Sequence, residues 1–171
     1  YDNYEEALKD SDFVITSIDK NLYTFNRRVS GPDDGLKFSY NADQSLIATP
    51  SIGNIDQDDE LEIIFAGLDD YAKLFAINHD GTLVDNFPIQ LNEKIYKGVA
   101  VADINHNSSM EIVVATKSGY LHVFDSFGNE LSGFPFYADD DIRSAPIIAD
   151  IDFDQNMEIL FGDDSGNFYC I

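Results

Sequence analysis

Short apolar runs separated by turn-forming residues make up most of the chain. Between residues 98 and 144 these runs are "GVAVA", "MEIVVAT", "YLHVFD" and "ELSGFPF". They are rich in β-branched and aromatic residues, which favour strands over helices. The stretches "HDGT" at 79–82 and "FGNE" at 127–130 are typical of tight hairpin turns, in which glycine supplies a positive φ. Only "NYEEALKD" at 3–10 has a helix-like pattern, so we predict an all-β chain.

The same pattern recurs along the sequence. Three segments align and place a glutamate at the same position of each, namely Glu62, Glu111 and Glu158, at spacings of 49 and 47 residues. Four short strands in a unit of this length are typical of a β-propeller blade. We therefore predict a β-propeller fragment built from four-stranded antiparallel blades, two of them complete and two partial.

The units divide the chain without a second domain. We expect a single partial propeller domain, 1–171, whose units span approximately 12–48, 49–97, 98–144 and 145–171. The first unit begins at its second strand and the last stops after its third, so the two end units are incomplete. A closed propeller usually has about four to eight blades. The remainder of the propeller is therefore expected in the parent chain.

Each loop between a first and a second strand carries oxygen-bearing side chains at its positions one, three, five and nine. The residues are Asn54, Asp56, Asp58, Glu62, Asp103, Asn105, Asn107, Glu111, Asp150, Asp152, Asp154 and Glu158. Alternate side chains in a tight loop can converge on one point, and their oxygens suit a hard cation. Calcium accepts about six to eight oxygens, whereas magnesium requires stricter octahedral geometry and zinc or copper prefer nitrogen or sulfur ligands. The alternative is that these loops bind no ion and hold their turns by side-chain to backbone hydrogen bonds.

With their length, loop spacing and following apolar strand, these units resemble the FG-GAP or VCBS-type repeats of integrin-like propellers. The calcium loops of that family follow the pattern D-x-D-x-D-G-x-x-D/E, and the resemblance covers roughly residues 12 to 171. It implies that the twelve loop residues bind calcium. It also implies that position seven of each loop, which is Glu60, Ser109 or Asn156, contributes a backbone carbonyl.

Two departures from the family pattern concern the loops themselves. The family's glycine at position six is replaced by Asp59, Ser108 and Gln155, which is expected to distort each loop. The second loop has asparagine at two of its four ligand positions, Asn105 and Asn107, which should weaken its affinity for a cation.

The composition excludes several classes of partner. Ten basic and 32 acidic residues give a formal net charge of −22, which argues against nucleic acid and anionic membrane surfaces. No apolar run approaches the roughly 18 residues needed for membrane insertion. Cys170 is the only cysteine, so neither a disulfide framework nor a cysteine-based zinc site is expected. The polar first residues do not read as a signal peptide within this chain.

No catalytic motif stands out, so an enzymatic role is uncertain and we lean against it. There is no Ser-His-Asp arrangement, nucleophile elbow or phosphate-binding glycine loop. The carboxylates occur in the same surroundings three times, whereas acid–base catalysis needs two carboxyl groups in different environments. The connections expected at the opposite face contain a possible partner-binding set, Tyr71, Tyr96, Lys97 and Arg143.

The resemblance leads to a functional expectation. The chain is expected to be a non-catalytic, calcium-binding propeller segment of a larger extracellular or cell-surface protein. Its role would be adhesion, or recognition of a protein or carbohydrate. The alternative is the propeller domain of a secreted enzyme, either similar to a polysaccharide lyase or serving to target a hydrolase. Fold alone does not decide between them, because propellers have many functions.

Overall fold

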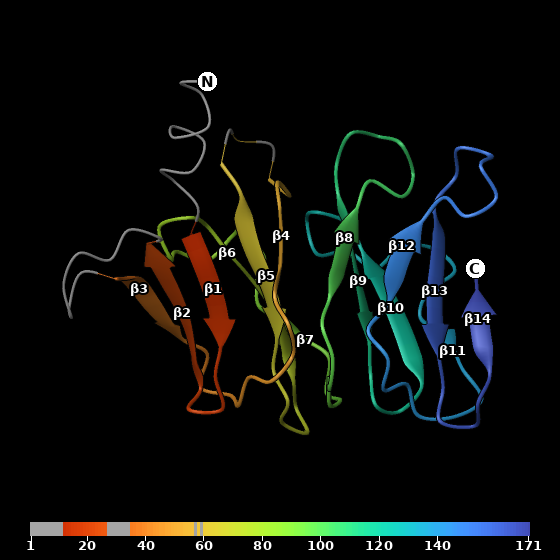
Figure 1. Ribbon diagram of the computed structural model, residues 1–171, viewed down its shortest axis with the longest axis horizontal. Coiled ribbons are helices and arrows are strands. Elements are labelled where there is room, and N and C mark those ends of the chain that lie inside the picture. The colour runs from red at the N-terminus through yellow and green to blue at the C-terminus, as the bar shows by residue number, and fades with distance from the viewer. Residues whose placement is uncertain (1–11, 27–34, 57, 59) are drawn as a thin grey trace, which may run out of the picture.

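A computed structural model describes residues 12–26, 35–56, 58 and 60–171, and every regular element in them is a β-strand (Figure 1). The strands are β1 (Asp12–Thr16), β2 (Asn21–Asn26), β3 (Leu36–Asn41), β4 (Ser51–Gly53), β5 (Glu62–Ala66), β6 (Lys73–Ile77), β7 (Ile89–Gln90), β8 (Ala100–Ala102), β9 (Glu111–Ala115), β10 (Tyr120–Phe124), β11 (Phe136–Tyr137), β12 (Ile147–Ala149), β13 (Glu158–Gly162) and β14 (Phe168–Cys170). The helix-like stretch 3–10 lies outside the described residues. Among those described, no helix has the length and apolar character needed to cross a membrane.

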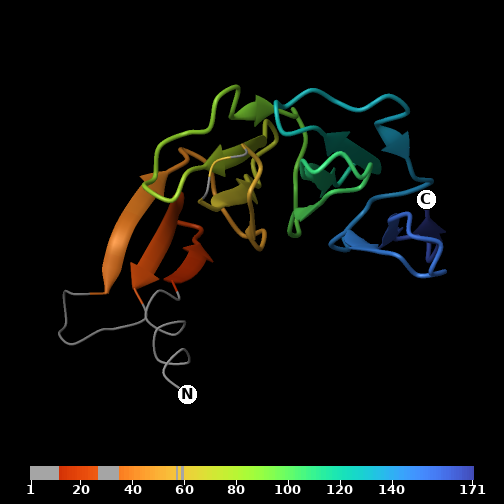
Figure 2. The same ribbon diagram turned by 90° about the horizontal axis from the view of Figure 1, so that it is seen from above.

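The strands form four antiparallel sheets. Their orders are β1-β2-β3, β4-β5-β6-β7, β8-β9-β10-β11 and β12-β13-β14. The prediction of two four-stranded sheets flanked by two incomplete ones is therefore confirmed. Seen from above, the sheets follow one another along an arc (Figure 2). The first strands of neighbouring sheets meet on its inner side, where β8 contacts both β4 and β12.

Apolar layers fill the spaces between successive sheets. Between the first and second sheets, Leu22 belongs to a buried cluster with Phe65 and Phe75, whose stacked rings have centroids 4.9 Å apart. Between the third and fourth sheets, the ring of Phe161 stacks on Tyr169 with centroids 4.8 Å apart. Burying a side chain of this size stabilises a fold by about 1.5–3 kcal/mol. The packing between sheets therefore fixes their order along the arc.

A repeated set of hydrogen bonds, here called the inter-sheet latches, joins each sheet to the turn between the second and third strands of the next. The backbone pairs are Leu68 N to Ser45 O at 2.8 Å, Lys117 N to Lys94 O at 2.7 Å, and Asp164 N to Asp141 O at 2.9 Å. The residue before each acceptor adds a side-chain bond. These bonds are Gln44 Nε2 to Tyr71 O at 2.7 Å, Thr116 Oγ1 to Glu93 Oε2 at 2.6 Å, and Ser165 Oγ to Asp140 Oδ2 at 2.8 Å. The latches recur with the sequence repeat, although no motif had pointed to them.

The hairpin turns form as the sequence predicts, but the fourth strand of each complete sheet is shorter than the apolar run suggests. Gly81 and Gly128 have φ values of 88° and 81°, as expected for the two hairpin turns. The run "ELSGFPF", by contrast, pairs only through an isolated bridge at Glu130 and the two-residue strand β11. Gly133 turns the chain with a φ of 97°, and Pro135 has no N–H to donate to a ladder.

Candidate metal centre

The three carboxylate loops lie at the same end of their sheets, at the top in Figure 1. They connect β4 to β5, β8 to β9 and β12 to β13. The glutamate at loop position nine is the first residue of the second strand in every case. Strand pairing therefore holds this side chain in place, and the loop folds back over it.

Glu62 is the distinctive residue of the first loop. It is fully buried, and its Oε2 accepts a hydrogen bond from the backbone amide of Ile55 at 2.8 Å. Its other oxygen, Oε1, is also buried but has no hydrogen-bond partner among the described residues. Leaving a buried acceptor unsatisfied costs about 1–3 kcal/mol, and more for a charged group. A proton, a water molecule or a cation would satisfy this oxygen, and a cation would also offset its charge.

Two further carboxyl groups lie near that of Glu62. One oxygen from each of Asp56, Asp58 and Glu62 lies within 4.8 Å of the others. Burial raises the pKa of Glu62 and the charges of the two aspartates raise it further, whereas the bond from Ile55 lowers it. A hard cation held among the three would remove both the repulsion and the unsatisfied oxygen. The donors are all oxygens, which suits calcium better than zinc.

Asn54 and Glu60, the other predicted ligands of the first loop, take part in hydrogen bonds that shape it. The Asn54 side-chain amide donates to the carbonyl of Asp58, and the Glu60 amide donates to Asp58 Oδ1 at 2.7 Å. Asp59, predicted to distort this loop, lies outside the described residues.

The second loop has the same buried glutamate but satisfies it internally. Glu111 is fully buried, and its Oε2 accepts from the amide of Ile104 at 2.8 Å. Its Oε1 accepts from the side-chain amide of Asn105 at 2.9 Å. The asparagine at position three thus supplies a donor that the first loop lacks among its described residues. The weaker cation affinity of the second loop stays a prediction.

The third loop again gathers three carboxylates, but in a more exposed setting. Oxygens of Asp150, Asp152 and Glu158 lie within 4.8 Å of one another, and Glu158 is only partly buried. In the second sheet, a Cβ added at Gly53 would meet Met110 Sδ at 2.8 Å, so the following sheet covers that end of the strands. Among the described residues, Glu158 is thus the most exposed of the three loop glutamates.

Side-chain to backbone hydrogen bonds hold the second and third loops. In the second loop, Asp103 accepts from the amides of Asn107 at 3.0 Å and Ser108 at 2.9 Å, and Asn107 Oδ1 accepts from Ser109 N at 2.7 Å. In the third, Asp150 accepts from the amides of Asp154 at 3.2 Å and Gln155 at 3.0 Å, and Asp154 Oδ1 accepts from Asn156 N at 2.8 Å. The bonds expected from the ion-free alternative are therefore present beside the carboxylate clusters.

In the second and third loops, the backbone at position six adopts the left-handed conformation that glycine favours. Ser108 and Gln155 have φ values of 69° and 77°. Position four is left-handed as well, with φ of 59° at His106 and 63° at Phe153, which the sequence had not indicated. A non-glycine residue in this region costs about 1 kcal/mol or more. The hydrogen bonds to Asp103 and Asp150 help to offset that cost.

The predicted partner-binding residues lie at the opposite end of the sheets. Tyr71 is 70% exposed and lines a cleft of about 380 Å³ together with Lys94. The guanidinium carbon of Arg143 lies 5.9 Å from the ring centroid of Tyr96, so these two are in contact. Lys97 is exposed. Binding of a partner here stays a prediction.

Comparison with known proteins supports the fold. No model of a protein family matches the chain, and no curated protein is similar enough in sequence to count as a relative. The structure is similar to that described as "BBS1N in complex with ARL6DN, soaked with lead", with a TM-score of 0.66 and 16% identity over 92% of this chain and 43% of the other. A mercury-soaked form of the same complex gives a TM-score of 0.61, with 15% identity over 94% of this chain and 50% of the other.

A third similar structure is the biofilm matrix protein Bap1 of V. cholerae. Its TM-score is 0.52, with 18% identity over 94% of this chain and 27% of that protein. The chain thus spans half or less of the structures that it matches. At these identities the similarity concerns the fold alone. Together with the four antiparallel sheets, it shows that the chain has the architecture of a β-propeller fragment.

Proposed function

We propose that this chain is a calcium-binding β-propeller segment of a larger extracellular protein, built from FG-GAP or VCBS-type repeats. It has no catalytic role of its own and serves adhesion, or recognition of a protein or carbohydrate. The observation that carries the proposal is the buried carboxyl group of Glu62, whose Oε1 has no partner among the described residues and which is clustered with the carboxyl groups of Asp56 and Asp58.

Calcium fits this position by its coordination chemistry. It binds about six to eight oxygens in flexible geometry, so three carboxylates, backbone carbonyls and water can complete its shell. In the first loop Asp56, Asp58 and Glu62 would hold the ion. When bound, it neutralises their charges and fastens the loop to the start of β5. The third loop offers Asp150, Asp152 and Glu158 for the same purpose, and we expect the second loop to bind weakest.

Two observations support a role outside the cell. Calcium concentrations there suit loops of the affinity expected for extracellular modules, with a Kd on the order of 10⁻⁴–10⁻³ M. One of the structures with a similar fold is a biofilm matrix protein. A surface with a net charge of −22 also agrees with a protein that works among dissolved cations.

Thermal unfolding of the chain in chelator, in about 10 mM magnesium and in about 10 mM calcium tests the proposal. With a Kd of about 10⁻⁴ M, calcium should stabilise the folded state by about 2.7 kcal/mol. The midpoint should then rise by roughly 5–10 °C. Magnesium should have a much smaller effect.

Two matched variants assign the response to the first loop. Glu62→Gln removes the unpartnered carboxylate and should abolish most of the calcium-dependent rise. Glu111→Gln alters the equivalent buried residue, whose Oε1 already has a donor, and should leave that rise nearly intact. A wild-type midpoint that does not respond to calcium, or an equal loss in both variants, would contradict the proposal.

A further inference from the structure

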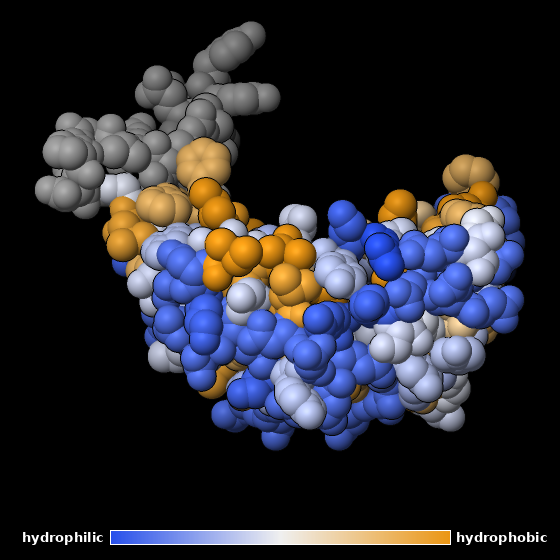
Figure 3. Space-filling view, turned by 90° about the horizontal axis from the view of Figure 1, so that it is seen from below, coloured by the Kyte–Doolittle hydropathy of each residue, from blue (hydrophilic) through white to orange (hydrophobic). Residues whose placement is uncertain are grey.

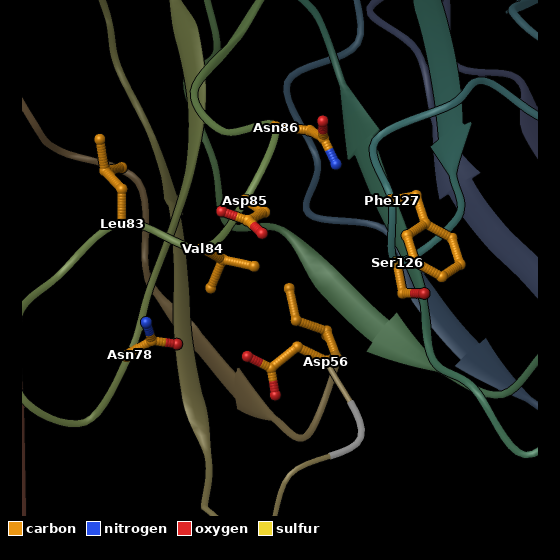
Figure 4. A pocket seen from close by; sticks show the side chains of 9 residues that line it. Asp56, Asn78, Leu83, Val84, Asp85, Asn86, Ser126 and Phe127 are labelled. Atoms are coloured by element: carbon orange, nitrogen blue, oxygen red, sulfur yellow. The ribbon is translucent and has the colours of Figure 1, made fainter.

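A cleft of about 520 Å³ lies between the second and third sheets, at the end that carries the first carboxylate loop (Figure 4). Its lining residues are Ile55, Asp56, Asn78, Leu83, Val84, Asp85, Asn86, Ser126 and Phe127. They come from the first carboxylate loop, from the connection between β6 and β7, and from the turn after β10. A volume of this size is typical of sites that enclose a small ligand or a side chain, about 300–1,000 Å³.

One carboxylate at the cleft has no partner of its own. Asp85 is exposed and forms no side-chain hydrogen bond or ion pair with any described residue. The Asn78 side-chain amide donates to Thr82 Oγ1 at 2.9 Å, so it is already used within the wall of the cleft. Asp56, a proposed calcium ligand, also lines the cleft, and the described lining contains no lysine, arginine or histidine. The Asp85 carboxylate therefore favours a ligand group that donates hydrogen bonds and carries positive charge.

The remaining lining is apolar, which distinguishes an organic cation from a metal ion. Leu83 and Val84 border the cleft on the side of the second sheet, and the ring of Phe127 lies on the opposite side. Phe127 is 65% exposed, so its face is open to a ligand. An aromatic ring attracts an ammonium or guanidinium group placed over it, and aliphatic side chains can pack along a methylene stem. A bare ion would use none of these surfaces.

We propose that this cleft binds the side chain of a lysine or arginine residue of a partner protein. The charged group lies beside Asp85, and the stem packs against Val84 and Phe127. The net charge of −22 attracts such a partner over a longer range. The inference deepens the proposed function, since it names the chemistry that the recognition module selects.

The probe is the tripeptide acetyl-Gly-Lys-Gly-amide, added to the whole chain labelled with ¹⁵N. The comparison peptide has norleucine in place of lysine, which keeps the four-carbon stem and removes the charge. The lysine peptide should shift the amide signals of Asn78, Asp85 and Phe127 saturably at millimolar concentration, and the norleucine peptide should not. Equal shifts with both peptides would overturn the proposal. If free 1,5-diaminopentane saturates the site at a lower concentration than the peptide, the ligand is a small amine and the assignment to a partner protein is wrong.

Matched variants distinguish binding in the cleft from a general attraction between the acidic chain and a basic peptide. Asp85→Asn should weaken binding of the lysine peptide about threefold to fivefold, the effect expected of one exposed ion pair. Asp139→Asn changes the net charge equally on an exposed residue between β11 and β12, and should leave binding unchanged. An equal loss in the two variants would show non-specific attraction and refute the site.

The same variants keep this inference independent of the calcium proposal. Asp85 is not among the three clustered carboxylates of the first loop, so Asp85→Asn should keep the calcium-dependent rise in midpoint. Glu62→Gln should lose that rise and still bind the lysine peptide. If the chain binds the peptide but ignores calcium, only the metal proposal fails. If it responds to calcium but binds neither basic probe, only the cleft proposal fails.

Discussion

The first and second carboxylate loops share a spacing and a fully buried glutamate, but they differ in what reaches its Oε1. In the second loop the side-chain amide of Asn105 donates to Glu111 Oε1 at 2.9 Å. In the first loop the same position is Asp56, whose carboxylate accepts hydrogen bonds, and Glu62 Oε1 has no partner among the described residues. One amide in place of a carboxylate thus separates a loop that satisfies its buried glutamate from a loop whose carboxylates could hold a cation. For the proposed cation binding, the number of acidic residues in a loop thus matters less than whether its buried glutamate has a hydrogen-bond donor.

Asn105→Asp should have the largest effect on this comparison. The substitution removes the donor to Glu111 and places a second carboxylate beside a buried one. In chelator the free energy of unfolding should fall by about 1–3 kcal/mol. Calcium should recover part of that loss, because the second loop then has the chemistry of the first. Chemical unfolding in chelator and in calcium measures both effects, and a variant as stable as wild type in chelator would contradict the explanation.

The second-largest effect is expected in the pH dependence of the free energy of unfolding, measured in chelator, to which Glu62 contributes. Its pKa is raised in the folded state by burial and by the neighbouring aspartates. It therefore contributes stability that is present below the ordinary glutamate pKa and is lost as pH rises through the raised value. Relative to Glu62→Gln, which cannot titrate, the wild type should lose at most about 1.4 kcal/mol per pH unit in that range. Urea unfolding of both chains at a series of pH values checks this, and parallel curves would rule it out.

Asp56→Asn should make the first loop resemble the second. The new side-chain amide can donate to Glu62 Oε1 as Asn105 does to Glu111. We expect a gain of about 1 kcal/mol in chelator and loss of the calcium response of this loop. The measurement is the same pair of unfolding curves. A variant that is less stable in chelator would mean that Asp56 has a structural role beyond its charge.

Asp152→Asn makes the equivalent change in the third loop and should have the smallest effect. Glu158 is partly exposed, so water already satisfies much of its carboxylate. We expect a change within about 0.5 kcal/mol in chelator, as for most exposed substitutions. A gain as large as that of Asp56→Asn would show that burial is not what separates these two loops.

The sequence predicted much of this architecture because the repeat is carried by local patterns. The strand period, the hairpin glycines and the loop spacing all depend on near neighbours along the chain, and the sheets formed as expected. What the loops do depends on contacts between sheets. The carboxylates of Glu62 and Glu111 look alike in sequence, and only packing shows that both are fully buried while Glu158 is not. The cleft at Asp85 was not predicted for the same reason, because its walls come from two sheets.

Apolar side chains of strands β1 and β4 show what an alternating pattern leaves undecided. Phe13, Ile15 and Ile52 are each about half exposed, at 57%, 53% and 51%. Seen from below, the molecule is mostly hydrophilic, and an apolar area interrupts it (Figure 3). An alternating strand pattern identifies such residues as apolar but does not say which of them a neighbouring sheet covers. The sequence alone therefore does not determine how far each apolar side chain is buried.

The inter-sheet latches have a consequence for how such an array can change in evolution. Each latch joins the end of one unit to the second turn of the next, through acceptors at Ser45, Lys94 and Asp141. The acceptors are 49 and 47 residues apart, so a unit excised or copied whole carries one half of each of two latches. We therefore expect duplication of a complete unit to regenerate these bonds, and an excision out of register with the repeat to leave their donors and acceptors unmatched.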